Sequence, residues 1–313
     1  MPSDTEPEID WDSLTFSFTQ TDRMYMAKCE IGGEWEKGAM KDYEDLVISP
    51  AAGVLNYGQG LFEGLKAQRA SDGSIVLFRP QQNARRAQEG ARRLGMPPVP
   101  EEMFLDAVIS AVRENSRWVP PMGKGALYIR PLLMGSGPIL GVAPAPEYTF
   151  LVFTSPVGPY FKGGITPTSL RVSDKFHRAA PGGSGGVKAI GNYAPGMIPS
   201  KMAKKEGYSE IIYLDAVNHR YIEEVGAANF FCVKDGVVST PELTGTILPG
   251  VTRSSIIELA SSRGYEVREE KVDVEYAMEA DECFCVGTAA VVSSIGKIAV
   301  SYTHLTLPTT SPV

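Results

Sequence analysis

A segment dense in glycine and proline divides this chain of 313 residues into two halves. It spans residues 158–168 and reads GPYFKGGITPT, a composition typical of a loop rather than of a helix or a strand. Strand-like runs and helical stretches occur on both sides of it, and we find no sequence repeats. The sequence therefore predicts an α+β fold with two domains, residues 1–157 and 169–299, joined by a linker or lid at 158–168.

The first half contains short strand-like runs interrupted by two helical stretches. Strands are predicted at 45–49, 74–78, 126–134 and 148–158. Helices are predicted at 81–95 and 101–119, because prolines follow each stretch and the second has apolar residues at helical spacing. Four helical arginines are expected to form a solvated face rather than a nucleic-acid patch: Arg85, Arg86, Arg92 and Arg93.

The second half begins again with strands, predicted at 210–215 and 228–240. Asp235-Gly236 is a hairpin signal within the second of these stretches. A helix is expected at 252–264, with Thr252 as its N-cap and Gly264 at its C-cap. Two further strands are expected in YEVREEKV and DECFCVG.

Composition excludes several classes of protein. The formal charge of −7 argues against a nucleic-acid partner, and no apolar run of about 18 residues predicts a membrane span. The four cysteines show no metal-binding spacing, so no metal is expected, and Cys283 and Cys285 are interpreted as core residues. The acidic N-terminus lacks the features of a signal peptide or presequence. We therefore expect a cytoplasmic location, while an organellar origin stays open.

The last residues, 300–313, read VSYTHLTLPTTSPV and follow a strand-like run without a turn signal. Their first codons back-translate to a transposon-end adapter used in sequencing libraries. We expect this tail to be non-native and the second domain to be truncated. An ordinary disordered tail is the alternative.

Lys188 is an unusual lysine, because no other charged residue lies between Arg178 and Lys201. Glycines precede it in GGVKAIGNY, and a lysine in such an apolar site can become a neutral amine that forms an imine with an aldehyde. On this feature alone, a structural lysine is the alternative.

Two further segments contain groups suited to a charged ligand, one a helix start and the other a pair of glutamates. The segment ILPGVTRSS leads into the predicted helix at Thr252, and a helix start binds phosphate through its unpaired N–H groups. In IEEVGAANFF, one of Glu223 and Glu224 should face inward, because neighbours in a strand point in opposite directions. An edge strand with both glutamates in water is the alternative. An imine lysine, a phosphate site and a buried acid are together the parts of a pyridoxal phosphate site.

Eight motifs occur in the order found in branched-chain aminotransferases, and the chain resembles this family over residues 11–299. The motifs are NYGQGLFEGLKA, LFRPQQN, LYIRPLLMGSGPILGV, VGPYFKGG, VKAIGNY, IEEVGAANFF, ILPGVTR and VGTAAVV. The resemblance implies the fold of type IV pyridoxal-phosphate enzymes, with a smaller first and a larger second domain and the active site at the domain interface. It also implies a homodimer.

The resemblance assigns roles to individual residues. Lys188 matches the lysine that forms the aldimine with pyridoxal 5'-phosphate and moves the proton. The other implied cofactor-binding residues are Arg79, Tyr193, Glu224, Val251, Thr252 and Thr288. The implied substrate-binding residues are Phe16, Tyr57, Phe62, Tyr128, Arg130, Tyr160, Ala227 and Ala289.

The implied reaction transfers the amino group of leucine, isoleucine or valine to 2-oxoglutarate. A D-amino-acid aminotransferase and an aminodeoxychorismate lyase on the same scaffold are alternatives, and so is an inactive truncated fragment. One departure from some family members is the sequence TAAVVSS at 288–294, where they carry a C-x-x-C motif. A redox switch is therefore not expected there.

Overall fold

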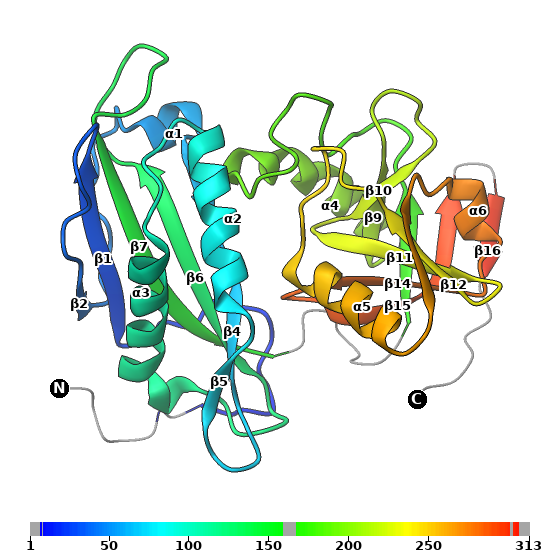
Figure 1. The fold of residues 1–313 in the computed structure, drawn as a ribbon, viewed down its shortest axis with the longest axis horizontal. Coiled ribbons are helices and arrows are strands. Elements are labelled where there is room, and N and C mark those ends of the chain that lie inside the picture. The colour runs from blue at the N-terminus through cyan, green and yellow to red at the C-terminus, as the bar shows by residue number, and fades with distance from the viewer. Residues whose placement is uncertain (1–6, 8, 159–166, 301–302, 307–313) are drawn as a thin grey trace. The chain divides into compact units, whose positions relative to one another are not determined.

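The computed structural model describes residues 7, 9–158, 167–300 and 303–306, of which the last four are described by their backbone only. The chain forms two compact units. The first unit comprises residues 1–160 and 187–191, and the second comprises 161–186 and 192–313 (Figure 1). Most of the predicted linker, with Tyr160, lies outside the described residues, so the predicted domain boundaries stay a prediction.

The first unit contains a seven-stranded antiparallel sheet with the order β2-β1-β7-β6-β4-β5, in which β3 also pairs with β6. Its strands are β1 (Arg23–Glu30), β2 (Ala39–Asp42), β3 (Gly60–Phe62), β4 (Leu65–Arg69), β5 (Ile75–Leu77), β6 (Ala126–Gly135) and β7 (Glu147–Val157). The long central pair, β6 and β7, runs in register from Ala126–Val157 to Gly135–Tyr148. This pair supports the short strands that carry the site residues.

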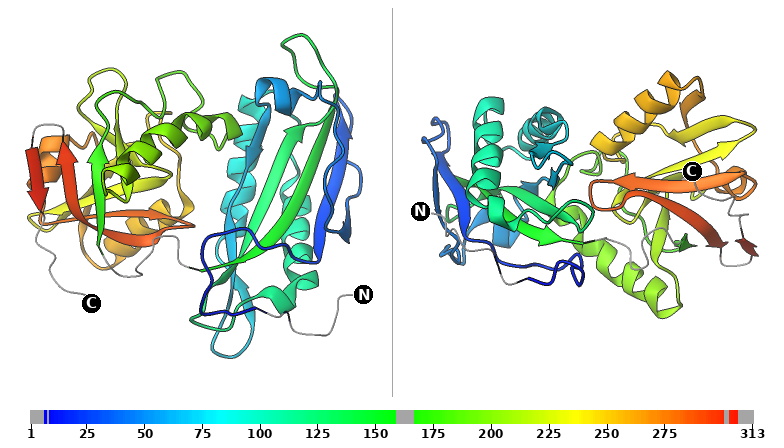
Figure 2. Two further views of the ribbon diagram at one scale, coloured as in Figure 1. Left: turned by 180° about the vertical axis from the view of Figure 1, so that it is seen from behind. Right: turned by 90° about the horizontal axis from the view of Figure 1, so that it is seen from below.

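Helices cover one face of this sheet (Figure 1; Figure 2). They are α2 (Pro80–Arg93) and α3 (Glu101–Glu114), while α1 (Gly53–Tyr57) and the 3-10 helix η1 (Ser116–Trp118) are short. Phe104 and Val108 of α3 are fully buried with Phe150 of β7 in the core between the helices and the sheet. Helix α3 ends at Glu114, earlier than the predicted residue 119. Asn115 ends it by donating its amide Nδ2 to the Ala111 carbonyl, and the helical region then continues as η1.

Two sequence predictions for the first unit are wrong. Residues 45–49 form no strand, because this stretch runs along the surface without a pairing partner in the described sheet, and Val47 is fully exposed. The arginines of α2 do not share one solvated face. Arg85, Arg92 and Arg93 are exposed, but Arg86 is buried against Glu63.

The second unit contains a nine-stranded sheet that closes on itself. Its strands are β8 (Thr168–Val172), β9 (Glu210–Leu214), β10 (Ile222–Val225), β11 (Ala228–Lys234), β12 (Val237–Pro241), β13 (Glu266–Glu270), β14 (Glu282–Gly287), β15 (Val291–Val300) and β16 (Thr303–Thr306). The strand order β10-β9-β8-β15-β14-β11 becomes a ring because β10 also pairs with β11. The remaining strands extend the sheet from β11 and β15. This closure leaves the ring without a free edge.

Alternating residues of these strands separate two cores. Phe230, Cys232, Cys283 and Cys285 belong to one core. Phe231 of the same strand β11 packs in the other core, beside Ile256 and Ile257 of helix α5 (Val251–Ser262). The cysteines are free and buried, and burial raises the pKa of Cys285 to about 12, as expected for core residues. The predicted hairpin is confirmed, since Asp235 and Gly236 have positive φ between β11 and β12.

The remaining helices connect the strands. They are η2 (Ile190–Asn192), η3 (Ala194–Gly196), α4 (Met197–Lys205), α5 (Val251–Ser262) and α6 (Val274–Met278). Within the described ranges, no helix combines the length and the hydrophobicity needed to cross a membrane.

Candidate active site

Lys188 is held against the sheet of the first unit, although the residues before and after its loop belong to the second. Its carbonyl accepts a hydrogen bond of 3.1 Å from the backbone N–H of Phe62 in β3. The next residue, Ala189, forms an antiparallel bridge with Leu61, which is buried in the core. The backbone of Lys188 is therefore fixed by strand-like pairing rather than carried on a loose loop.

Two cations lie against the ring of Phe62. The Lys188 Nζ atom is 4.6 Å from the ring centroid, and the Arg130 guanidinium carbon is 4.5 Å from it. Arg130 also donates to the Tyr128 hydroxyl at 3.2 Å, and the Tyr128 ring packs edge-on against Phe16 at 5.2 Å. The structure thus brings together five of the predicted residues, which we call the Phe62 cluster: Phe16, Phe62, Tyr128, Arg130 and Lys188.

The Arg130 Nε atom is buried and has no hydrogen-bond partner among the described residues. A buried donor without an acceptor is rare in folded proteins and costs about 1–3 kcal/mol. Its position beside Tyr128 and Phe62 makes it a candidate to donate to a bound ligand.

Glu63 is a charged neighbour of this cluster that the sequence analysis did not single out. It is fully buried and forms a two-point ion pair with Arg86, with distances of 2.8 Å and 2.7 Å. Burial alone would raise the pKa of Glu63, but Arg86, the charge of Lys188 and a hydrogen bond from Asn83 together hold this pKa below its usual value. The buried position of Arg86 explains why the solvated-face prediction fails.

Tyr57 and Arg79 make other contacts in the first unit. Tyr57 is 40% exposed, and its hydroxyl donates to the Leu140 carbonyl. Arg79 precedes α2 in the left-handed region, with φ of 48°, and its guanidinium lies 5.4 Å from the ring of Phe78. A non-glycine residue in this region is strained, and such strain often marks functional sites. These contacts do not connect either residue to the Phe62 cluster.

Glu224 lies in the second unit and forms a buried ion pair with Arg178. Its Oε2 atom is 2.7 Å from Arg178 Nε, and its Oε1 accepts the Leu248 N–H at 2.7 Å. Arg178 also donates to the carbonyls of Gly185 and Thr246. Arg178 was not predicted as a site residue. The requirement that a buried carboxylate has a cationic partner was the available signal for it.

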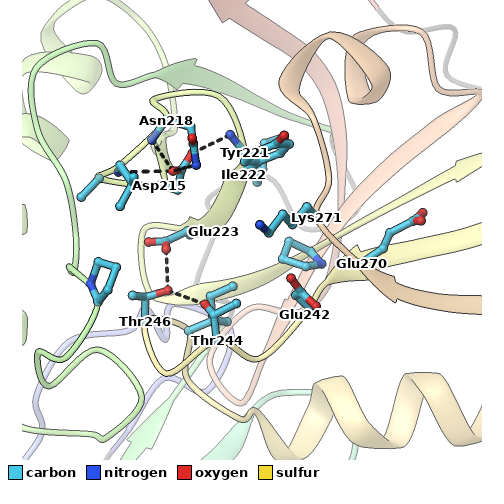
Figure 3. Close-up of a pocket in the computed structure, with 15 residues that line it drawn as sticks. Asp215, Asn218, Tyr221, Ile222, Glu223, Glu242, Thr244, Thr246, Glu270 and Lys271 are labelled. Carbon is cyan, nitrogen blue, oxygen red and sulfur yellow. Dashed lines mark hydrogen bonds between the residues drawn. The ribbon is translucent and has the colours of Figure 1, made fainter.

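Both glutamates of the IEEV motif are buried, with exposed fractions of 5% for Glu223 and 2% for Glu224. The edge-strand alternative is therefore wrong, and so is the expectation that only one of them turns inward. The pairing of β10 with β9 shifts register between Ile222 and Glu224, and such a bulge breaks the alternation of side chains. Glu223 accepts a hydrogen bond from Thr246, as Figure 3 shows, while Glu224 binds Leu248 of the same segment.

The start of α5 lies near the β10–β11 hairpin. The N-cap is Gly250 rather than the predicted Thr252, which is the second residue of the helix, and no side chain caps this end. A Cβ atom on Gly250 would lie 2.1 Å from the Asn229 Oδ1 atom, so any larger residue here would require the Asn229 side chain to move. Because Asn229 pairs with both Glu224 and Val286, this helix start lies beside β10, β11 and β14. Val251 and Thr252 therefore lie near the strand that carries Glu224.

Two predicted turns are at the ends of these same strands. Ala227 is exposed in the turn between β10 and β11, and Thr288 and Ala289 form the turn between β14 and β15. A Cβ atom on Gly287 would lie 3.8 Å from the Ala227 carbonyl, which shows that the turns are adjacent. Tyr193 is half-buried before η3 in the same unit, and Tyr160 lies outside the described residues.

Comparisons with known proteins identify the family. The family model for class IV amino-transferases matches residues 60–298. Branched-chain-amino-acid aminotransferase 5, chloroplastic, of Arabidopsis thaliana is 57% identical over 93% of this chain and 70% of its own length. The chain belongs to the class IV aminotransferases, and it is therefore a transaminase. Methionine aminotransferase BCAT4 of the same plant is 50% identical over 93% of this chain and 82% of its own length.

Solved structures confirm the α+β fold. The branched-chain amino acid aminotransferase of Escherichia coli has a TM-score of 0.78 at 29% identity, covering 92% of this chain and 89% of its own. The branched-chain aminotransferase of Thermoproteus uzoniensis with norvaline has a TM-score of 0.80 at 27% identity, covering 93% of this chain and 90% of its own.

Proposed function

We propose that this chain transfers the amino group of L-leucine, L-isoleucine or L-valine to 2-oxoglutarate with pyridoxal 5'-phosphate as its cofactor. The identity of 57% to a branched-chain enzyme supports the substrate class. The observation that carries the proposal is the position of Lys188, fixed by backbone pairing beside Phe62, with a second cation on the same ring. A lysine held beside apolar surface is suited to covalent attachment of an aldehyde.

The residues of the second unit fit the charges of this cofactor. The start of α5 has no side-chain cap, so the N–H groups of its first turn, together with Thr252, suit a phosphate. We propose that Val251, Thr252, Thr288 and Arg79 bind the phosphate and that Tyr193 binds the phenolic oxygen. Arg178 favours the ionised form of Glu224, and this charge suits a protonated ring nitrogen. When bound, the cofactor supplies an electron sink that makes loss of the Cα proton possible.

The residues of the chain have separate tasks in the reaction. Lys188 Nζ would take up the proton from the substrate Cα and hold it for the transfer that the bound cofactor would make possible. The Phe62 cluster excludes water and offers an apolar wall to a branched side chain, and we propose that Tyr160 belongs to the same lining. Tyr57 is proposed to lie near the substrate carboxylate. The N–H groups of the turns at Ala227 and Ala289 hold the substrate carboxylate.

The second substrate, 2-oxoglutarate, carries an acidic side chain that an apolar wall alone would reject. Arg130 can supply the missing donor, because its buried Nε has no acceptor among the described residues. A charged donor that is already in place binds a carboxylate at little reorganisation cost. One site can thus accept both kinds of substrate.

The experiment is an absorbance spectrum of the chain with pyridoxal phosphate, recorded before and after addition of L-leucine. We expect a visible band that leucine removes, and production of glutamate when 2-oxoglutarate is added. Lys188→Ala should abolish the band, whereas Lys205→Ala, an exposed lysine of α4, should keep it. A folded chain without this band would contradict the cofactor assignment.

Parallel assays separate the alternatives. Faster reaction with L-methionine than with L-leucine would favour the activity named for the 50%-identical relative. Preference for D-alanine would indicate a D-amino-acid aminotransferase, and pyruvate release from aminodeoxychorismate would indicate the lyase. Circular dichroism and a size measurement would distinguish an inactive, poorly folded fragment from all of these.

We also propose that the chain works as a homodimer. Val47, Leu140 and Val142 are 101%, 90% and 88% exposed, and a hydrogen bond from Ile139 N–H to the Ala51 carbonyl joins the two loops that carry them. Exposed apolar side chains on two loops that are joined in this way are a feature of many protein interfaces. Light scattering should report a dimer, and Val142→Asp should weaken it. The cytoplasmic location stays a prediction, and the 57%-identical relative is named as chloroplastic.

A further inference from the structure

The second unit contains a pocket of about 260 Å³ that none of the assignments above uses. Its walls come from the loop at 215–221, from β10, from residues 241–247 and from Glu270 and Lys271 (Figure 3). None of its lining residues belongs to the predicted cofactor or substrate sets.

Glu223 gives this pocket an unsatisfied acceptor. The residue is only 5% exposed, and its Oε1 atom accepts from Thr246. Its Oε2 atom is buried without a hydrogen-bond partner among the described residues, although the side chain lines the pocket. Buried carboxylate oxygens nearly always have a donor, so this atom points to a ligand that donates a hydrogen bond.

The other charged groups of the pocket favour a cationic ligand. Asp215 is occupied by its own loop, because it accepts backbone N–H bonds from residues 217, 218, 220 and 221. Glu242 and Glu270 add two more carboxylates, against the single ammonium of Lys271, which lies 5.5 Å from the Tyr221 ring. The pocket therefore has an excess of negative groups.

The walls between these charges are apolar. Ile222, Pro241 and Ile247 are buried and line the pocket, while Val217 adds an exposed apolar side chain at its rim. A hydrated metal ion would gain nothing from such walls, whereas an alkyl group would be removed from water by them.

We propose that this pocket binds a small organic cation, an alkyl group carrying an ammonium or guanidinium whose N–H donates to Glu223 Oε2. The alkyl part packs between Ile222, Pro241 and Ile247, and the carboxylate of Glu242, which also lines the pocket, adds charge attraction. The site is independent of the transamination proposal, because no cofactor or substrate residue takes part.

The test is calorimetric titration of the whole chain with isobutylguanidinium chloride at low salt. A guanidinium does not condense with an aldehyde as a primary amine does, so the cofactor site does not contribute to the signal. We expect saturable binding of one equivalent, with a Kd on the order of 1 mM or below. Isobutylurea, which has nearly the same shape but no charge, should not bind.

Variants assign the contact. Glu223→Gln should weaken binding at least about tenfold, the usual effect of losing a charged hydrogen bond. Glu275→Gln removes an exposed carboxylate of α6 that does not line the pocket, so it should leave the affinity unchanged. Glu242→Gln, at a partly exposed position, should weaken binding several-fold. If circular dichroism shows that Glu223→Gln is unfolded, the affinity of Glu242→Gln becomes the test of whether the cation binds in this pocket.

Three results would overturn the proposal. They are the absence of saturable heat, equal binding of isobutylurea, and wild-type affinity in a folded Glu223→Gln variant. Where that variant is unfolded, wild-type affinity in Glu242→Gln would overturn it instead.

Discussion

Replacing Arg86 by methionine tests the buried ion pair behind the Phe62 cluster. The substitution keeps an unbranched apolar side chain in α2 but removes both hydrogen bonds from Arg86 to Glu63. Glu63 is then left fully buried, with Asn83 still donating to it. Breaking a buried pair by removing one partner costs about 3–5 kcal/mol of stability.

The magnitude can be worked from the protonation of Glu63. Without Arg86 the carboxyl can become neutral by taking up a proton, which costs about 1.4 kcal/mol for each pH unit above its ordinary pKa of about 4.3. At pH 7 this amounts to about 3.7 kcal/mol, and at pH 5 to about 1 kcal/mol. The destabilisation should therefore shrink by between about 2 and 3 kcal/mol from pH 7 to pH 5.

The same pH dependence follows from the thermodynamic linkage between proton binding and folding. In the wild-type chain the pKa of Glu63 is lowered, so the pair stabilises above the ordinary pKa of a glutamate and loses this contribution as the pH falls through the folded-state pKa. In the variant, burial raises the pKa of Glu63, so stability is lost as the pH rises. Both effects make the difference between the two proteins grow with pH.

The assay is unfolding in guanidinium chloride followed by tryptophan fluorescence. All three tryptophans, Trp11, Trp35 and Trp118, belong to the first unit, so the signal reports on the unit that contains the pair. Arg85→Met is the matched control, because Arg85 pairs with Glu101 at the surface and should cost under about 1 kcal/mol. Equal losses for the two variants, or a loss at Arg86 that does not change with pH, would refute the reasoning.

Three further predictions concern other residues. Glu223→Gln should raise the midpoint of thermal unfolding at pH 8 but hardly at pH 4, because burial raises the pKa of Glu223 and its ionisation costs stability as the pH rises; a lower midpoint at pH 8 would contradict this. Asp215→Ala should destabilise the chain at pH 6. Burial would raise the pKa of Asp215, but backbone N–H groups overcome this effect and lower the pKa to about 2. In an acid titration followed by circular dichroism, the difference in stability between the variant and the wild type should therefore vanish near pH 2. Gly64→Ala should lower kcat/KM for leucine about 100-fold, because its Cβ would lie 2.2 Å from the Tyr128 hydroxyl, whereas Gly141→Ala has open space and should keep the activity.

The sequence alone determined much of the local structure. Helices α2 and α3, the hairpin at Asp235-Gly236 and the buried cysteines follow from periodicity, turn chemistry and alternation, which act over a few residues. The isolated position of Lys188 was also visible, because glycines and an absence of nearby charge are properties of the sequence itself. The family resemblance, now confirmed, named the site residues, and their individual roles remain predictions.

Which charged residues are buried depends on contacts between distant parts of the chain. Arg85 and Arg86 are neighbours in one helix, and their different environments depend on Glu63, which lies 23 residues away from Arg86 on another element. Likewise, the bulge in β10 buries both Glu223 and Glu224, and it arises from how this strand pairs with β9. Strand register and the partner of a buried charge are set by contacts between distant segments. Sequence patterns that extend over a few residues do not contain these long-range contacts. The free energy of burying a charge depends on the same contacts, because they supply its partner.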